Sequence, residues 1–151
     1  MSSRQSEKKL VQAFYQALEG AAVADIPGVM AKFCNSNLTW RGFHPFNEIT
    51  GPEAVAVEFW QPLRTSLTRM QRRLDVFMAG QNMFDDAGGV WVCSMGHLMG
   101  LFDQPWLGIR PTGKMIFLRY CAFHRVQDDK IAETAMYFDI PHLMMQAGLQ
   151  P

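Results

Sequence analysis

The chain has 151 residues, of which 48% are hydrophobic and 19% charged, as in a globular domain that buries a core without disulfides or metals. Lysine and arginine (14) balance aspartate and glutamate (14), so the charge gives no reason to expect nucleic acid or an anionic membrane as partner. No apolar run approaches the roughly 20 residues that span a bilayer. The polar stretch 2–9 lacks the apolar segment of a signal peptide. We expect one domain, residues 1–151, in a cytoplasmic protein.

The N-terminal part of the chain predicts two helices. Over residues 7–22 apolar side chains recur at helical spacing, which indicates an amphipathic helix with one buried face. Asp25 and Pro27 indicate a second, short helix over about 26–33, because aspartate caps helices and proline suits a first turn.

A strand and a third helix follow. Residues 37–43 alternate between polar and apolar side chains, as a half-buried strand does. Thr50 and Glu53 have the spacing of a capping box, so we expect a helix to begin there. Pro62 has no backbone N–H to donate, and we expect it to end or kink this helix.

The second half of the chain has the alternating pattern of strands. Strands are predicted over about 69–80, 88–102, 114–127 and 130–138, followed by a short helix that begins near Pro141 and ends by Gly148. Helices followed by a run of antiparallel strands define an α+β domain, in which the helices pack on one side of the sheet.

The strand at 115–126 is apolar on both faces. One face carries Met115, Phe117 and Phe123, and the other carries apolar side chains at nearly every alternate position. A single layer of helices covers only one face of an antiparallel sheet. We therefore expect a second copy of the chain to cover the other face, in a symmetric homodimer that packs sheet against sheet.

Several segments are typical of one protein family. The Gly-Ile-Arg-Pro-Thr-Gly turn at 108–113 is the most specific, because proline and two glycines fix one backbone course. The others are the third helix within 51–60, the Asp-Asp-Lys-Ile hairpin with its glutamate at 128–133, and the closing helix at 143–148. Over residues 7–149 the chain resembles the SnoaL-like polyketide cyclase and ester cyclase family of the nuclear transport factor 2-like superfamily.

This resemblance implies a fold and a pocket. The fold is a cone-shaped α+β barrel, with three N-terminal helices packed on a curved antiparallel sheet and a short C-terminal helix. The pocket of such proteins opens between the helices and the concave face of the sheet. Asp129 stands where the family commonly has a hairpin glycine, and aspartate tolerates the positive φ of that position.

The resemblance also implies chemistry. Enzymes of the family act on small hydrophobic carbonyl compounds and need no cofactor. Moving a proton beside a carbonyl requires a base, a donor for the developing enolate oxygen and an apolar wall. We therefore favour an enzyme of the cyclase, isomerase or hydrolase type. The alternative is a non-catalytic protein that binds a small ligand or a partner on the same scaffold.

Three polar residues are candidates for acid–base catalysis: Asp139, His124 and His97. Asp139 is the best acid, although its place just before the last helix also suits a helix cap. His124 and His97 lie in apolar strands, where a hydrogen-bonded structural histidine is the alternative. Characterised cyclases of the family carry a histidine and an aspartate on adjacent C-terminal strands. These align with Ala122 and Met136, or with His124 and Asp139 nearby.

Aromatic side chains are the candidates for the pocket wall, because an apolar ligand site needs aromatic lining with few polar groups. Each of them is also a candidate for the ordinary core. The predicted ligand-binding residues are Tyr15, Trp40, Phe59, Trp60, Trp106, Tyr120 and Tyr137.

The remaining reactive side chains are expected to be structural. Four histidines and three cysteines without paired spacing do not predict a metal site. Arg119 lies in the most apolar strand, and we expect Glu133 on the next strand to pair with it. Four arginines near the end of the third helix are most simply a solvated edge, with an anion site as the alternative: Arg64, Arg69, Arg72 and Arg73.

Overall fold

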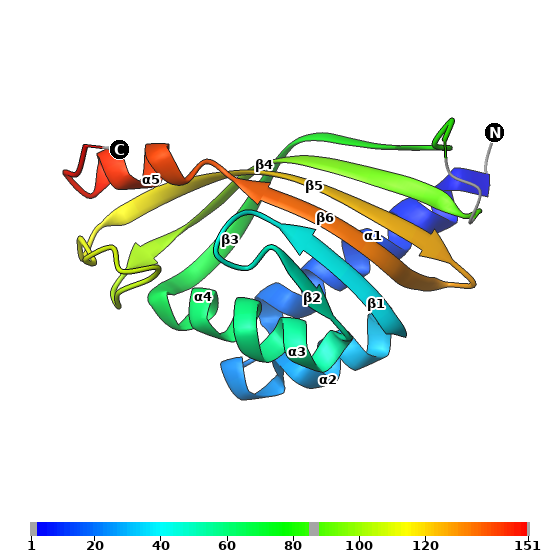
Figure 1. The fold of residues 1–151 in the computed structure, drawn as a ribbon, viewed down its shortest axis with the longest axis horizontal. Coiled ribbons are helices and arrows are strands. Elements are labelled where there is room, and N and C mark those ends of the chain that lie inside the picture. The colour runs from blue at the N-terminus through cyan, green and yellow to red at the C-terminus, as the bar shows by residue number, and fades with distance from the viewer. Residues whose placement is uncertain (1–2, 85–87, 151) are drawn as a thin grey trace.

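The computed structural model describes residues 3–84 and 88–150, which form one curved sheet with helices against one side of it (Figure 1). The strands are β1 (Cys34–Gly42), β2 (Glu48–Thr50), β3 (Leu67–Gly80), β4 (Val90–Phe102), β5 (Met115–Gln127) and β6 (Lys130–Phe138). The helical segments are α1 (Ser3–Gly20), η1 (Val23–Asp25), α2 (Ile26–Phe33), α3 (Pro52–Val55), η2 (Ala56–Trp60), α4 (Gln61–Ser66) and α5 (Ile140–Gln146).

The strand order across the sheet is β2-β1-β6-β5-β4-β3. Neighbouring strands are antiparallel except β1 and β6, which are parallel. Helices and four other strands separate β1 from β6 in the sequence. This provides the long connection that a parallel pair requires. The predicted α+β class, with helices on one face of a curved sheet, is confirmed. Within the described ranges the cone is an open, mixed sheet whose edges are β2 and β3.

The four long strands and the last helix begin and end within two residues of their predicted positions. Asp128 and Asp129 form the hairpin with φ values of 53° and 59°, so aspartate does take the place of a glycine there. Gly148 has a φ of 80° and follows the end of α5, as predicted. The prediction missed β2, because three residues are too few to show an alternating pattern.

The third helix differs from its prediction. Thr50 ends β2, and Gly51 rather than Thr50 precedes the first helical turn, with a φ of 90°, so the predicted capping box is wrong. The helical path continues through Pro62 as far as Ser66. A π-helical turn, η2, ends two residues before this proline, and its wider winding accommodates the proline ring. Among the helices of the described ranges, none has both the length and the apolar character needed to cross a bilayer.

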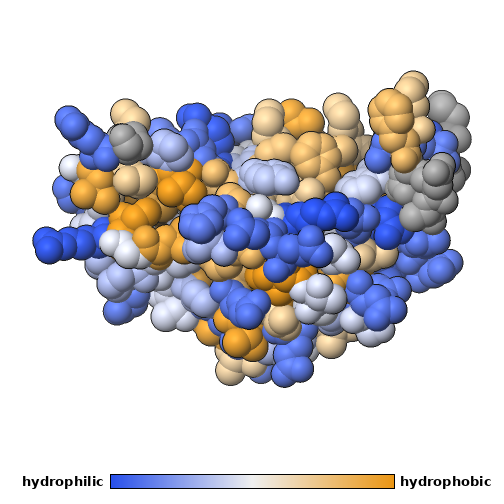
Figure 2. All heavy atoms as spheres, viewed as in Figure 1, coloured by the Kyte–Doolittle hydropathy of each residue, from blue (hydrophilic) through white to orange (hydrophobic). Residues whose placement is uncertain are grey.

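The two faces of the sheet differ in what covers them. Alternate residues of β5, from Ile116 to Val126, point toward the helices and are buried, and we call this side the concave face. The opposite side, the convex face, has no helical layer in Figure 1, and Figure 2 shows apolar side chains along the upper rim of the molecule. Its exposed large apolar side chains are Met78, Met95, Met115, Phe117 and Tyr137.

Gly96 of β4 lies opposite an irregularity in β3 between Leu74 and Val76. A Cβ atom at Gly96 would lie 1.9 Å from the carbonyl oxygen of Arg73, so one strand would have to move. We expect Gly96→Ala to lower the free energy of unfolding by about 1–3 kcal/mol, as overpacking does, measured by urea unfolding. Gly80→Ala is the control, because its Cβ would have no neighbour within 4 Å. Equal effects of the two substitutions would contradict this explanation.

Candidate functional site

A chain of buried hydrogen bonds crosses the interior on the concave side. The hydroxyl of Tyr15 lies 2.7 Å from Nε2 of His124, and Nδ1 of the same ring lies 2.9 Å from Oγ1 of Thr134. All three residues are buried, and His124 is 1% exposed. A neutral imidazole donates at one nitrogen and accepts at the other. The ring therefore joins the two hydroxyl groups in either tautomer.

Local structure explains why these three side chains meet. Tyr15 lies on the apolar face of α1, which packs against β3 and β4. Alternation along β5 places His124 on the same face as Tyr120, as the sequence predicted. The pairing register then sets Thr134 of β6 directly opposite His124. An otherwise apolar interior thus receives one continuous polar chain.

Arg72 of the edge strand β3 lies next to this chain. The Cζ atom of its guanidinium lies 3.5 Å from the ring centroid of Tyr15 and 4.7 Å from that of Tyr120. These are cation–π contacts. The hydroxyl of Tyr120 is in turn 2.5 Å from Oγ of Ser94. Nε and Nη1 of Arg72 are buried and have no hydrogen-bond partner among the described residues.

The surroundings keep Tyr15 and His124 uncharged at neutral pH. Burial, and after it the positive charge of Arg72, lowers the pKa of His124 from 6.5 to about 3. Burial raises the pKa of Tyr15 to about 12, although the charge of Arg72 acts in the opposite direction. The tyrosine therefore keeps its proton. Its single O–H group is free to donate to a ligand in the tautomer in which Nε2 of the neutral ring carries the hydrogen and donates to the tyrosine oxygen.

A hollow of about 190 Å³ lies between α1 and β3, beside the buried hydrogen bonds of Tyr15, His124 and Thr134. Its lining includes Tyr15 and Arg72, and we call these two residues together with His124, Thr134, Tyr120 and Ser94 the polar cluster. The exposed side chains of Gln12 and Gln16 also line it, so it opens to solvent. The described residues that line it are Gln12, Tyr15, Gln16, Glu19, Arg72 and Leu74.

The three predicted acid–base residues do not lie together. His124 is on the concave face, whereas His97 and its cross-strand neighbour Arg119 are on the convex face. Asp139 caps α5 by accepting a hydrogen bond of 3.1 Å from the backbone N–H of His142, and it pairs with Arg119 at 3.0 Å. The cap that the sequence indicated is thus present. A catalytic role for Asp139 or His97 stays a prediction.

Four of the predicted aromatic ligand-binding residues lie in one buried cluster. The rings of Trp40 and Phe59 have centroids 4.7 Å apart, and those of Phe59 and Trp60 are 4.9 Å apart. The void beside Trp106 is about 10 Å³, at the lower limit for one water molecule. The indole N–H groups of Trp40 and Trp106 are buried without a hydrogen-bond partner in the described part of the chain. Tyr137 lies apart from them on the convex face and is 48% exposed.

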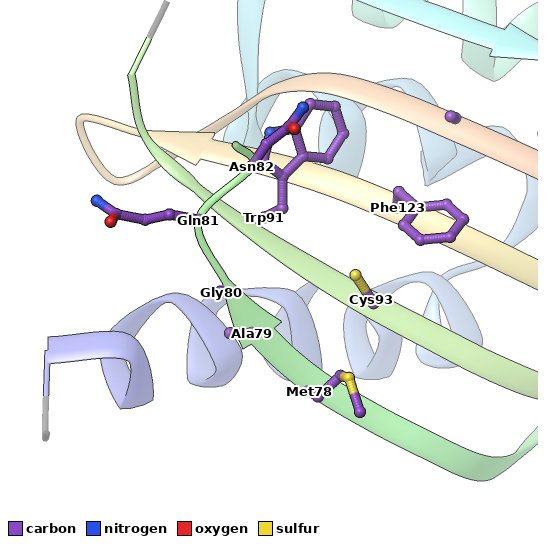
Figure 3. A pocket seen from close by; sticks show the side chains of 9 residues that line it. Met78, Ala79, Gly80, Gln81, Asn82, Trp91, Cys93 and Phe123 are labelled. Carbon is purple, nitrogen blue, oxygen red and sulfur yellow. The ribbon is translucent and has the colours of Figure 1, made fainter. Parts of the chain in front are cut away.

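A larger hollow, of about 430 Å³, lies on the convex face (Figure 3). Met78, Cys93 and Phe123 lie beside one another across β3, β4 and β5, and Trp91 lies nearer the end of the hairpin. Among the described residues that line this hollow, none is acidic, basic or histidine. It is an apolar surface groove without an acid–base group, and we do not assign the chemistry to it.

The predicted ion pair between Arg119 and Glu133 is wrong. Glu133 instead binds Arg41 at 2.5 Å and Arg125 at 3.2 Å. The cause is the register between β5 and β6, which sets Glu133 opposite Arg125. Arg119 lies further along β5, beside the start of α5, where Asp139 is the carboxylate within reach.

The arginine cluster was expected to be a solvated edge of the domain, and only part of it is exposed in that way. Arg64 donates to the backbone carbonyl groups of Leu18 and Ala21 and so satisfies the C-terminal end of α1. Arg72 belongs to the polar cluster, while the neighbouring Arg73 lies on the convex side. The sequence could not separate these residues, because an irregular pairing of β3 between Thr68 and Gln71 interrupts simple alternation.

Ser94 and Thr134 were not predicted as site residues. Each is a hydroxyl residue at an inward position of a mostly apolar strand. That pattern is the signal that could have identified them, once the inward face was known.

The described residues contain no group of three histidine, cysteine, aspartate or glutamate side chains placed to hold a metal ion. Cys34, Cys93 and Cys121 are free thiols. Burial raises the pKa of Cys34 to about 12, so its thiol stays protonated and behaves as a small apolar side chain.

Comparison with known proteins identifies related chains. The family model for SnoaL-like polyketide cyclase matches residues 67–147. A candidate SnoaL-like polyketide cyclase from Jannaschia sp. CCS1 has a TM-score of 0.78 at 18% identity, over 97% of this chain and 94% of that chain. A candidate polyketide cyclase from Xanthomonas campestris pv. campestris has a TM-score of 0.70 at 22% identity, over 95% and 98%. No curated protein sequence matches the chain.

A third similar structure widens the range of relatives. It is a hypothetical protein with a ketosteroid isomerase-like fold from Catenulispora acidiphila, in complex with trimethylamine. Its TM-score is 0.65 at 14% identity, over 93% of this chain and 92% of that chain. At such identities these likenesses show a shared fold.

The low pKa of His124 makes a prediction for stability. Below pH 6.5 the unfolded chain protonates this histidine, whereas the folded protein does so near pH 3. Stability that depends on the neutral ring is therefore complete above pH 6.5 and is lost as the pH falls toward 3. We expect the unfolding free energy of the wild type, minus that of His124→Gln, to shrink by about 1.4 kcal/mol per pH unit in this window.

Urea unfolding at pH 7, 6 and 5 measures this difference. His44→Gln is the matched control, because it removes an exposed histidine from a loop. A difference between wild type and His124→Gln that stays constant over this range would show that the ring protonates equally in both states.

Proposed function

Because the chain belongs to the SnoaL-like polyketide cyclase family, we propose that it is a cofactor-independent enzyme of the cyclase, isomerase or hydrolase type. Its substrate would be a small hydrophobic carbonyl compound, converted by acid–base chemistry. The observation that carries this proposal is the buried chain from Tyr15 through His124 to Thr134, which reaches the hollow between α1 and β3.

Of the hydrogen-bonded residues Tyr15, His124 and Thr134, Tyr15 is the one that would touch the substrate. It lines the hollow and keeps its proton at neutral pH, since its pKa is raised to about 12. A protonated hydroxyl donates a hydrogen bond to a carbonyl oxygen, and that bond strengthens as the oxygen takes the charge of an enolate. The carboxylate of Glu19, in the lining of the same hollow, would take the proton that leaves the α-carbon. Because the tyrosine hydroxyl is buried beside the hollow, this stabilisation is greater than it would be in bulk solvent.

His124 would act through Tyr15 as a positioning residue. It lies behind the tyrosine and does not line the hollow. Its hydrogen bond to Tyr15 holds the hydroxyl in place, and its other nitrogen is fixed by Thr134. These two hydrogen bonds therefore fix the position and orientation of the tyrosine hydroxyl.

Non-catalytic binding of a small hydrophobic ligand is the second candidate function. The observation that favours it is the pKa of His124, which at about 3 makes the ring a weak base. Both functions place a carbonyl ligand against Tyr15. Turnover distinguishes them.

Exchange of α-protons for deuterium tests the proposed enzyme. The probe is 1-indanone in D₂O, followed by ¹H NMR with and without protein. The wild type is expected to accelerate exchange over buffer, and Tyr15→Phe to reduce that acceleration by about 100-fold, within the usual range for loss of a general acid. His44→Gln is the control, because it removes an exposed histidine that is not among the residues lining the hollow.

Two outcomes would contradict this placement of the site. Binding of 1-indanone without faster exchange would favour the non-catalytic ligand-binding function. Loss of exchange in His97→Gln or Asp139→Asn, with Tyr15→Phe still active, would move the chemistry to the convex side of the sheet.

We further propose that the protein forms a homodimer through the convex face. This face carries exposed apolar side chains such as Met95 and Phe117. It also carries both signs of charge, with Arg73 beside Asp75 and Arg119 beside Asp139. A face with paired opposite charges around apolar side chains is complementary to a second copy of itself.

Met95→Glu tests the dimer by placing a charge at the centre of this face. We expect the wild type to elute as a dimer in size-exclusion chromatography with light scattering, and Met95→Glu as a monomer, because an unpaired buried carboxylate opposes association. Val57→Glu is the control, since Val57 is a similarly exposed apolar residue on η2. A monomeric wild type at about 100 μM would overturn the proposal.

A further inference from the structure

Arg72 has hydrogen-bonding capacity that the protein does not use. Its Nε and Nη1 atoms are buried and have no hydrogen-bond partner among the described residues. Buried N–H groups are satisfied in the great majority of cases, and an unpaired one on a cation is costlier than on a neutral group. This guanidinium therefore calls for a partner beyond its protein neighbours.

The aromatic contacts restrict where that partner can lie. The ring of Tyr15 lies against the guanidinium, at 3.5 Å from Cζ, and the ring of Tyr120 lies 4.7 Å from the same atom. Stacking contacts use the faces of the guanidinium plane, whereas its N–H bonds point outward within that plane. A partner must thus approach at the edge of the group. Arg72 lines the hollow between α1 and β3, and because Nε and Nη1 are buried, a partner in the hollow would meet them after a small turn of the side chain.

No carboxylate of the described residues lies within ion-pair distance of the Arg72 guanidinium. Glu19 is the acidic residue in the lining of the hollow, and its Oε1 atom accepts a hydrogen bond of 2.8 Å from the backbone N–H of Arg72. That contact satisfies the main chain and leaves the side-chain charge unbalanced. A buried charge without a counterion is costly, and an anion supplied by a ligand would offset the cost.

We propose that Arg72 binds the carboxylate of the ligand, and that the substrate is a small carbonyl compound that also carries a carboxylate group. This inference rests on the proposed function, because it takes the hollow beside Tyr15 as the substrate site. The hollow of about 190 Å³ exceeds by more than tenfold the roughly 10–15 Å³ that holds one water molecule. A short keto acid fits that space, with its carboxylate on Arg72 and its carbonyl oxygen on Tyr15.

Binding of an anion would also change His124. The charge of Arg72 is the second cause of the low pKa of this histidine, after burial. The other groups that face the ring are Tyr15 from α1 and Thr134 from β6, and neither is charged. A carboxylate on Arg72 would therefore make protonation of His124 less unfavourable, and the ring would become a better base when the substrate is bound.

Isothermal titration calorimetry with benzoate and its neutral analogue benzamide tests the proposal at pH 7. The variants are Arg72→Gln and the matched control Arg73→Gln. Arg73 is the adjacent arginine, but it lies on the convex side, pairs with Asp75 at 3.3 Å and is 58% exposed in its side chain. We expect the wild type to bind benzoate more tightly than benzamide. Arg72→Gln should weaken benzoate at least about tenfold, as loss of a charge-assisted hydrogen bond does, while Arg73→Gln should change it by less than twofold.

A second measurement uses the wild type alone, so that a folding defect of Arg72→Gln cannot obscure the result. In ¹⁵N-labelled protein, the Nε–H resonance of Arg72 is expected to shift on addition of benzoate and to stay in place with benzamide. Benzoate affinity unchanged in Arg72→Gln, equal affinity for the two probes, or no saturable benzoate binding up to about 50 mM would each overturn the proposal.

Failure of this inference differs from failure of the proposed function. If the protein accelerates exchange of 1-indanone but binds benzoate equally well in Arg72→Gln, the proposed carboxylate site is wrong and the proposed enzymatic function stands. If benzoate binding depends on Arg72 but the protein does not accelerate exchange, the carboxylate site stands and the proposed enzymatic function is wrong.

Discussion

The helices cover one face of the curved sheet, and this constraint decides the surroundings of every side chain on the four long strands. Alternation along each strand sends neighbouring residues to opposite faces. On β5, His124 therefore enters a closed interior, whereas Arg119 on the other face keeps more than half of its side chain exposed. The same division separates Arg72, inside, from Arg73, outside. Two arginines adjacent in the sequence thus have unrelated roles.

Burial on the concave side also determines the charge state of the site. The desolvation that disfavours charge keeps Tyr15 protonated and His124 neutral. The guanidinium of Arg72 lies in the same place, over the rings of Tyr15 and Tyr120. The result is a protonated hydroxyl held by a neutral histidine, with the Arg72 guanidinium and the Glu19 carboxylate in the lining of one small hollow. Such an arrangement is complementary to an oxygen that becomes negative during a reaction.

The sequence predicted the elements well, because each long strand alternates cleanly and ends at a turn residue. It predicted His124 and Tyr120 on one face for the same reason. It failed at Thr50, where a glycine at positive φ precedes the helix instead. At Pro62 the helix does not end, and a π-helical turn precedes it.

The site was predicted in part for a different reason. Three of its members, Tyr15, Tyr120 and His124, were candidates because their residue types suit an apolar pocket. Arg72 was named only within the arginine cluster, with an anion site as the alternative, and Thr134 was not named, because their positions in the site depend on strand register and on irregular pairing in β3. Register is a property of two strands together, and neither strand shows it alone.

The central claim is that Tyr15 donates a hydrogen bond to the carbonyl oxygen of a ligand on the concave side. The most direct measurement is the ¹³C NMR shift of carbonyl-labelled 1-indanone bound to the wild type and to Tyr15→Phe. The account predicts a downfield shift in the wild type, as polarisation by a donor produces, and its loss in the variant. A bound carbonyl with the shift it has in an apolar solvent, unchanged by the substitution, would contradict the account.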